Sequence, residues 1–279
     1  MADDARANSQ SGTAHWIAAA RARESARADR LFDDPFAAVL AGARGRAALA
    51  ASETAAGGEN AFLPIRTRFF DDLLLAEAER LDQVVLLGAG LDTRAFRLTL
   101  PAQLRWFEID RPELLDEKER VLAGLGAVAR CQRSVVATDL NADWSSPLLD
   151  SGFHRGCRTA WIAEGLLFYL SEGGVRGMLA EARRLAGDGS LVAADVFGSG
   201  LLTLPAMQPA LAGRTQRGLP PPFTTDDPIA LFSAAGWSSV EVALPGQPAT
   251  TYGRSLDDAK DRPFADDPTM RSYLVVARR

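Results

Sequence analysis

Cysteine and histidine are scarce in this sequence. Its 279 residues include two cysteines, Cys131 and Cys157, and two histidines, His15 and His154. Two cysteines cannot build a disulfide framework, and no Cys/His pair has the spacing of a zinc site. We therefore expect neither a disulfide-stapled domain nor a metal centre.

Long apolar runs and a strong charge bias are also missing. The longest apolar stretch, residues 84–91, has eight residues, whereas a membrane-spanning helix needs about 18 or more. Residues 1–4 are acidic where a signal peptide would be basic. The formal net charge is −5, without a stripe of basic residues. We expect a soluble cytoplasmic protein with no membrane and no nucleic-acid partner, whose oligomeric state the sequence leaves open.

The middle of the chain has the pattern of a parallel α/β sheet. Between about residues 80 and 197, short apolar runs alternate with helical patterns at 112–124 and 172–186. Repeated strand–helix–strand units predict a doubly wound sheet that is covered on both faces. The expected strands are 83–88, 104–110, 134–139, 159–164 and 190–196.

The flanking segments have a different texture. Residues 11–79 have apolar residues at helical intervals and predict several helices. A proline-rich loop is expected over 204–223, then a helix over 227–235 and strands near 238–244 and 271–277. We predict a single domain over 1–279, which has four parts: a helical cap (1–75), a cofactor-binding core (76–197), a lid insertion (198–224) and a segment that completes the sheet (225–279).

A glycine turn follows the first expected strand, and an acid ends the second. Gly88 and Gly90 would let the backbone approach a ligand and expose amide groups. Asp110 lies 22 positions after Gly88, where a carboxylate can accept both hydroxyls of a ribose. Ligands of open parallel sheets bind beyond the carboxyl ends of the strands. The combination predicts a ligand that contains adenosine.

The other strand ends discriminate between adenosine ligands. A dinucleotide fingerprint has Gly or Ala where this chain has Thr93, and the third and fourth strands end in Asp139 and Glu164. Acids suit a cationic ligand with a ribose and an amino group better than they suit a pyrophosphate. S-adenosylmethionine therefore fits better than NAD. Asp139 also has a simpler interpretation, as a helix cap for the segment that starts at Asn141.

Longer motifs surround these residues. The runs VVLLGAGLDTRAFRL (84–98) and WFEIDRPELLDEKERVL (106–122) occur together with RARESARADRLFDDPFA (21–37), RTRFFDDLL (66–74), ATDL (137–140) and AEGLLFYL (163–170). In this combination the chain resembles the leucine carboxyl methyltransferase-like enzymes, which include bacterial polyketide O-methyltransferases. The resemblance implies a Rossmann-like class I methyltransferase sheet of about seven strands, the last one antiparallel, and S-adenosylmethionine as the cofactor.

The resemblance also implies roles around the methionine portion of the cofactor. Arg66 of the RTRFFDD segment would bind the methionine carboxylate, with a bidentate geometry that a guanidinium favours. Arg68 is the alternative. Gly88 and Gly90 would lie against the methionine portion, and Glu164 would lie near its amino group.

At the adenosine end, the resemblance implies that Asp110 holds the ribose hydroxyls. Asp139 would accept from the adenine amino group, while Leu140 would pack on the ring. Asp92 would orient the turn after the first strand or bind through water.

The acceptor side carries no motif. A carboxylate is already ionised at pH 7, whereas a phenol with a pKa of about 10 gains from a base. His15 and Tyr169 are candidates for this chemistry, although packing explains each more simply, and His154 is expected away from the site. We predict O-methyl transfer to a carboxylate or hydroxyl of a small, polyketide-like metabolite. The alternatives are a protein C-terminal carboxyl methyltransferase, an NAD-dependent oxidoreductase and a non-catalytic cofactor-binding protein.

Three pairs of acids lie outside these roles. Residues 33–34 are expected to open a helix ahead of Pro35, as an N-cap would. Residues 71–72 and 257–258 are expected on solvated surface.

Overall fold

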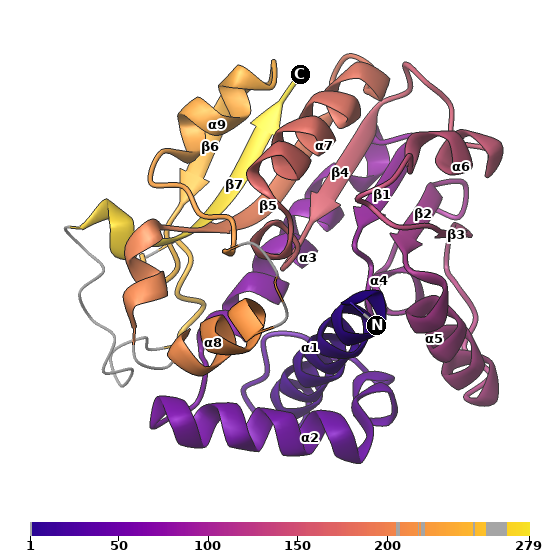
Figure 1. Cartoon of the computed structure of the whole chain (residues 1–279). Helices are drawn as coiled ribbons and strands as arrows, with labels where there is room; N and C mark the ends of the chain where they lie inside the picture. The colour runs from indigo at the N-terminus through magenta and orange to yellow at the C-terminus, as the bar shows by residue number, and fades with distance from the viewer. Residues whose placement is uncertain (1, 205–206, 217, 219–220, 248, 255–266) are drawn as a thin grey trace.

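Seven strands form one twisted sheet in the order β3-β2-β1-β4-β5-β7-β6 (Figure 1). The structure is a computed structural model, and it describes residues 2–204, 207–216, 218, 221–247, 249–254 and 267–279. Strands β1 to β5 pair in parallel, and β7 runs antiparallel to both β5 and β6. The strands are β1 Gln83–Leu87, β2 Arg105–Asp110, β3 Gln132–Ala137, β4 Thr159–Ala163, β5 Leu191–Phe197, β6 Ser238–Ala243 and β7 Ser272–Arg278. The predicted doubly wound fold with about seven strands is confirmed.

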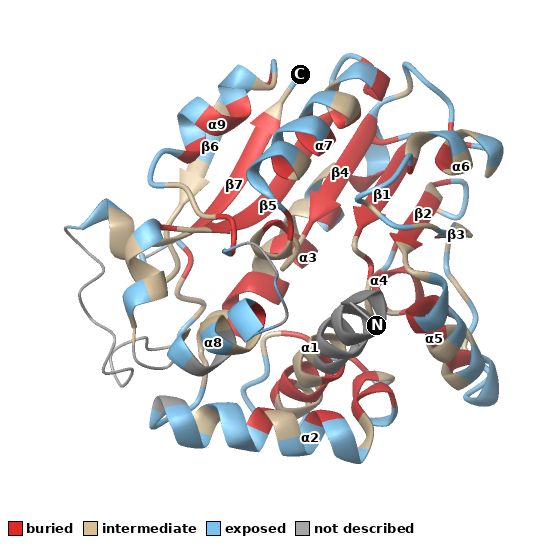
Figure 2. Cartoon of the chain, viewed as in Figure 1, coloured by how far each residue is buried: buried red, intermediate tan, exposed pale blue. Residues whose placement is uncertain are grey.

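The central strands are apolar along their whole length because both faces of the sheet are covered. In β1, Val84 and Leu86 pack into a core on one face, whereas Val85 and Leu87 pack into a second core on the other. The first core lies under α3 (Phe62–Glu77), α4 (Arg94–Arg97) and α5 (Pro112–Gly124). The second lies under α6 (Ser145–Asp150), α7 (Glu172–Leu185) and α9 (Pro228–Ala234). Figure 2 shows the buried strands between exposed helix faces. Alternation of side chains along a strand supplies both cores at once.

The first two helices of the chain cover the edge of the sheet where the parallel strands end. They are α1 (Ala2–Ser25) and α2 (Ala37–Ala56), which pack on each other beyond the strand ends (Figure 1). Their close approach depends on Gly45, because a Cβ there would lie 2.3 Å from the backbone oxygen of His15. The helical prediction for this region is confirmed.

The expected proline-rich loop over 204–223 was partly wrong. It contains helix α8 (Gln208–Gln216), which packs on the short helical segment Ser199–Thr203 that follows β5 (Figure 1). Leu, Ala, Arg and Gln between 211 and 216 favour a helix. The surrounding prolines led to the prediction of a loop instead. The two proline-free strand predictions that follow are confirmed as β6 and β7.

The acid pairs behave in different ways. Asp34 accepts hydrogen bonds from the backbone amides of Phe36 (3.2 Å) and Ala37 (3.1 Å), so it supports the turn before α2. The N-cap prediction for residues 33–34 was wrong, because the N-cap position of α2 is Phe36. The surface prediction for Asp71 was wrong, since this residue is 3% exposed and binds Arg94 and Arg97. Helix periodicity turns Asp71 inward while Asp72 stays half-buried. Residues 257–258 lie outside the described residues.

Candidate active site

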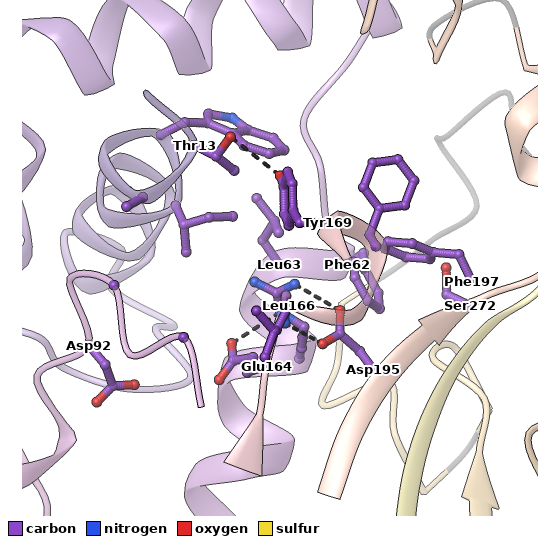
Figure 3. Close-up of a pocket in the computed structure, with 18 of the residues that line it drawn as sticks. Thr13, Phe62, Leu63, Asp92, Glu164, Leu166, Tyr169, Asp195, Phe197 and Ser272 are labelled. Carbon is purple, nitrogen blue, oxygen red and sulfur yellow. Dashed lines mark hydrogen bonds and ion pairs between the residues drawn. The ribbon is translucent and has the colours of Figure 1, made fainter. Parts of the chain in front are cut away.

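A cavity of about 700 Å³ opens beyond the carboxyl ends of the parallel strands. This volume is within the range of about 300–1,000 Å³ that is typical of small-molecule sites. Its walls come from the turn after β1, the ends of β2 to β5, and parts of α1 and α3 (Figure 3). The cavity is lined by every one of the residues predicted to bind the cofactor: Arg66, Gly88, Gly90, Asp110, Asp139, Leu140 and Glu164.

The turn after β1 needs its glycines. Gly88 and Gly90 have φ values of +69° and +51°, in the left-handed region that glycine adopts without strain. A Cβ on Gly88 would also lie 2.9 Å from Cδ1 of Leu166. The turn therefore brings backbone to the cavity wall where a side chain would not fit.

Asp110 connects the end of β2 to this turn. Its Oδ2 accepts from the Gly90 amide and its Oδ1 from the Arg111 amide, both at 2.7 Å. Burial raises the pKa of the Asp110 carboxyl above its usual value, although the Gly90 and Arg111 amides oppose this shift. A carboxylate has about four lone-pair positions. Two of them serve the backbone, so two remain for a diol.

Arg66 lies on α3 between two carboxylates. Its Nε donates to Oε1 of Glu164 at 3.1 Å, and its Nη1 donates to Oδ2 of Asp195 at 2.9 Å. Figure 3 shows Glu164 and Asp195 pointing toward the same guanidinium from β4 and β5. Burial alone would lower the pKa of Arg66, but Asp195 and Glu164 raise it overall. The guanidinium is therefore charged and fixed in place.

Sequence reasoning missed Asp195. The rule that singled out Asp110, an acid near the carboxyl end of a parallel strand, also applies to this residue in β5. Asp195 stands between Ala194 and Val196, so it looked like part of the strand interior.

A second buried arginine, Arg94, extends the charged cluster. Its Nε donates to Asp71 at 2.7 Å, and its Nη1 lies 2.7 Å from Oε2 of Glu164 and in contact with Asp92. Oδ1 of Asp92 also accepts from the Arg94 amide at 2.7 Å. Burial tends to raise the pKa of Asp92, but Arg94 lowers it overall. Asp92 thus binds both the backbone and the side chain of Arg94, at the start of α4.

Asp139 and Leu140 follow β3 and line the cavity. Oδ1 of Asp139 accepts from both the backbone amide and the side-chain amide of Asn141, each at 2.8 Å. The helix-cap interpretation of Asp139 was wrong, because α6 begins at Ser145. Asp139 is exposed and Leu140 is half-buried against the second core.

Of the two candidates for the acceptor chemistry, Tyr169 lies in the cavity wall and His15 does not. Tyr169 lines the cavity, and its hydroxyl lies 3.3 Å from Oγ1 of Thr13 (Figure 3). Burial raises the pKa of the Tyr169 phenol, despite opposition from Thr13, so the phenol is neutral at pH 7. His15 is buried outside the cavity lining, with Nε2 2.9 Å from Oε1 of Glu117.

Arg68 is also turned away from the cavity. Its Nε donates to Asp72 at 2.7 Å and its Nη1 to the Leu31 carbonyl at 2.6 Å. His154 is exposed. Neither residue is part of the described cavity lining. In the described part of the chain, no group of three or more His, Cys, Asp or Glu residues could hold a metal ion, and no helix is long and apolar enough to cross a membrane.

The other half of the cavity is apolar and aromatic. The rings of Phe62 and Phe168 each lie against Phe197, with centroid distances of 5.9 and 5.7 Å. In Figure 3, Phe62 and Phe197 lie on the side of Asp195 away from Asp92, and Tyr169 lies above them toward Thr13. Aliphatic side chains also line the cavity, among them Leu201, Leu204, Met207 and Leu244, together with the polar residues Arg271 and Ser272.

The strand order and the antiparallel β7 define a class I methyltransferase fold. Solved structures share it. A DUF574 family protein from Streptomyces avermitilis has a TM-score of 0.59 at 14% identity, covering 85% of this chain and 91% of that one. A putative methyltransferase from Thermobifida fusca has a TM-score of 0.57 at 16% identity, covering 85% and 88%.

Sequence comparison identifies the family. A model of the leucine carboxyl methyltransferase family matches residues 14–182. A protein from Frankia alni is 38% identical over 279 residues, covering 96% of this chain and 94% of that protein. One from a Parafrankia strain is 48% identical over 189 residues, covering 64% of this chain and 60% of that protein. Both are described as "Putative S-adenosyl-L-methionine-dependent methyltransferase". The chain belongs to the leucine carboxyl methyltransferase family, a group of S-adenosylmethionine-dependent methyltransferases.

The residues of the site fit this cofactor. S-adenosylmethionine carries a carboxylate, an ammonium group, a sulfonium and a ribose diol. The cavity offers a fixed guanidinium in Arg66, and carboxylates in Glu164 and Asp110 that have accepting capacity. The positive-φ turn at Gly88 and Gly90 leaves room for backbone contact with a ligand. The guanidinium suits the carboxylate of this ligand, and the two carboxylates suit its ammonium group and its diol.

Proposed function

We propose that the protein transfers a methyl group to an oxygen of a small, polyketide-like metabolite, at a carboxylate or a hydroxyl. One observation carries this proposal: a single cavity joins the charged, glycine-lined half to an apolar half with Phe62, Phe168 and Phe197 in its wall. An aromatic and aliphatic wall favours an acceptor with a largely apolar skeleton.

On this proposal, Arg66 binds the methionine carboxylate and Glu164 binds the amino group. Asp110 accepts from the ribose hydroxyls, while Asp139 and Leu140 hold the adenine. The bound cofactor supplies an electrophilic methyl group on a sulfonium. The residues of the chain contribute alignment of donor and acceptor and exclusion of water.

A general base is not required for the acceptors that this site favours. The described residues that line the cavity include no histidine. Tyr169 packs against Phe168 of the aromatic wall, and its neutral phenol can donate a hydrogen bond but cannot accept a proton at pH 7. This arrangement favours an acceptor that is already ionised, such as a carboxylate, or an acidic phenol.

A screen with methyl-labelled S-adenosylmethionine tests the proposal. Candidate acceptors are aromatic and aliphatic carboxylic acids, phenols of graded pKa and, as the protein alternative, peptides with a free C-terminus. We expect label in small apolar acids or phenols, as base-labile esters or base-stable ethers respectively. Label in peptides alone would overturn the small-molecule assignment, and label on nitrogen or carbon would overturn O-methylation.

A further inference from the structure

Asp195 is a buried acid with no role in the proposed contacts to the cofactor. It lies near the carboxyl end of β5, its side chain is 1% exposed, and it lines the cavity beside Arg66 and Glu164. A buried carboxylate is costly unless hydrogen bonds and opposite charge compensate it. The partners of Asp195 therefore indicate what it does.

The two oxygens of Asp195 fix two different segments. Oδ2 accepts from Nη1 of Arg66 at 2.9 Å, and Oδ1 accepts from the Gly165 amide at 2.5 Å. Gly165 follows Glu164 directly, with φ +64°, and a Cβ there would lie 3.0 Å from Nη1 of Arg66. One side chain thus sets the guanidinium from α3 against the backbone that follows β4.

This arrangement leaves the outer part of the guanidinium for a ligand. Glu164 engages Nε of Arg66 and Asp195 engages Nη1. Among the described residues, Nη2 has no hydrogen-bonded carboxylate, and Arg66 lines the cavity. Among the described residues, Asp195 and Glu164 share the neutralisation of Arg66. If Asp195 were lost, Glu164 would have to turn more of its lone pairs toward Arg66, and fewer of the Glu164 lone pairs would remain for an ammonium group.

We propose that Asp195 is a positioning residue for recognition of the cofactor carboxylate, which acts by holding the Arg66 guanidinium in its ligand-binding orientation. This inference rests on the proposed contact between Arg66 and the methionine carboxylate. Loss of Asp195 should therefore weaken the binding of one group of the ligand, the methionine carboxylate. A general structural role would affect every ligand of the cavity alike.

Asp195→Asn is the direct test, because the amide has nearly the same shape but only one acceptor oxygen for two donors. The probes are S-adenosylmethionine and its decarboxylated form, which keeps the sulfonium and the amine but lacks the carboxylate. Calorimetry on the full chain should show S-adenosylmethionine binding weakened about 10- to 100-fold. Binding of the decarboxylated probe should change less than about threefold, on the same reasoning.

The matched control is Asp143→Asn. Asp143 is an exposed acid that also accepts backbone hydrogen bonds, from Ser145 and Ser146 at the start of α6, and both probes should bind this variant as they bind the wild type. Asp195→Glu is the second variant, for use if the asparagine variant fails to fold. It keeps the negative charge on a side chain that is one methylene longer. The loss of affinity should be smaller than in Asp195→Asn, but still greater for S-adenosylmethionine than for the decarboxylated probe.

Equal losses for both probes, or no loss for either, in a folded Asp195 variant would overturn the proposal. Arg66→Lys separates this failure from failure of the proposed cofactor placement. One outcome is that Arg66→Lys weakens S-adenosylmethionine more than the decarboxylated probe while the Asp195 variants weaken both equally. In that case the contact between Arg66 and the carboxylate is supported, and the positioning role of Asp195 is wrong. If Arg66→Lys weakens both probes equally, the contact itself is wrong.

Discussion

Replacing Asp110 with alanine should remove the ribose contact of the proposed cofactor site. Gly90 and Arg111 occupy two of the roughly four lone-pair positions of this carboxylate, which leaves one for each hydroxyl of a diol. A hydrogen bond to a charged group contributes about 1.5 kcal/mol at the low end. Two such bonds give about 3 kcal/mol, or about a 150-fold increase in the Kd of S-adenosylmethionine.

Calorimetry at pH 7 measures this effect, with thermal unfolding to verify that the variant folds. Asp82→Ala is the control, because Asp82 also accepts a backbone hydrogen bond, from Arg158 at 2.8 Å, but lies at the opposite end of the sheet. A folded Asp110→Ala variant with the wild-type Kd would falsify the ribose assignment. So would an equal loss in Asp82→Ala.

The same residue predicts a pH dependence. Burial raises the pKa of Asp110, and the diol needs the charged form. Affinity should therefore fall as the pH falls through that raised pKa, beginning above the ordinary aspartate value of about 3.9. Calorimetric titrations between pH 7 and pH 4 should show this loss in the wild type and a flatter profile in Asp110→Asn.

Three further substitutions have expected outcomes. Asp34→Asn should lower the free energy of unfolding by about 2–3 kcal/mol at pH 7. The folded-state pKa of Asp34 is lowered, because its arginine neighbours outweigh burial. Its stabilising effect is thus present above the unfolded pKa of about 3.9 and is lost at lower pH; a constant gap in urea unfolding at pH 7 and pH 3 would contradict this. His15→Gln should leave kcat within about twofold, because the imidazole faces Glu117, and a hundredfold drop would restore His15 as a base. Gly165→Ala should raise the Kd of S-adenosylmethionine about tenfold by displacing Arg66, and an unchanged Kd would contradict that close approach.

The fold, and the place of several residues in the cavity wall, could be predicted because both depend on short-range pattern. Each parallel strand is a short, mostly apolar run, and a glycine or an acid lies at its end or within two residues after it, although Glu108 and Asp195 show that an acid can also lie inside a strand. Asp110, Asp139 and Glu164 were found in this way. All three line one cavity, because parallel strands bring their carboxyl ends to the same edge.

The rest of the site depends on orientation and long-range pairing, which no local pattern encodes. In α1, Thr13 and Trp16 face the cavity, and His15 lies between them in sequence but points to Glu117 on α5. A helix advances about 100° per residue, so neighbours in sequence face different ways. Asp71 likewise finds Arg94 23 positions away, a pairing that only the packed fold creates.

The cost of the buried charges argues that the cluster around Arg66 serves recognition more than stability. Four charged residues of this cluster are buried, namely Arg66, Arg94, Asp71 and Asp195. They form ion pairs with one another and with the partly buried Arg97, Asp92 and Glu164. Replacing buried ion pairs by apolar residues of similar size is often neutral or stabilising, by about 1–4 kcal/mol. A chain selected for stability alone would have little reason to keep such a cluster in a cavity wall. What the cluster provides is a guanidinium whose orientation is fixed during folding, so that binding does not have to order it.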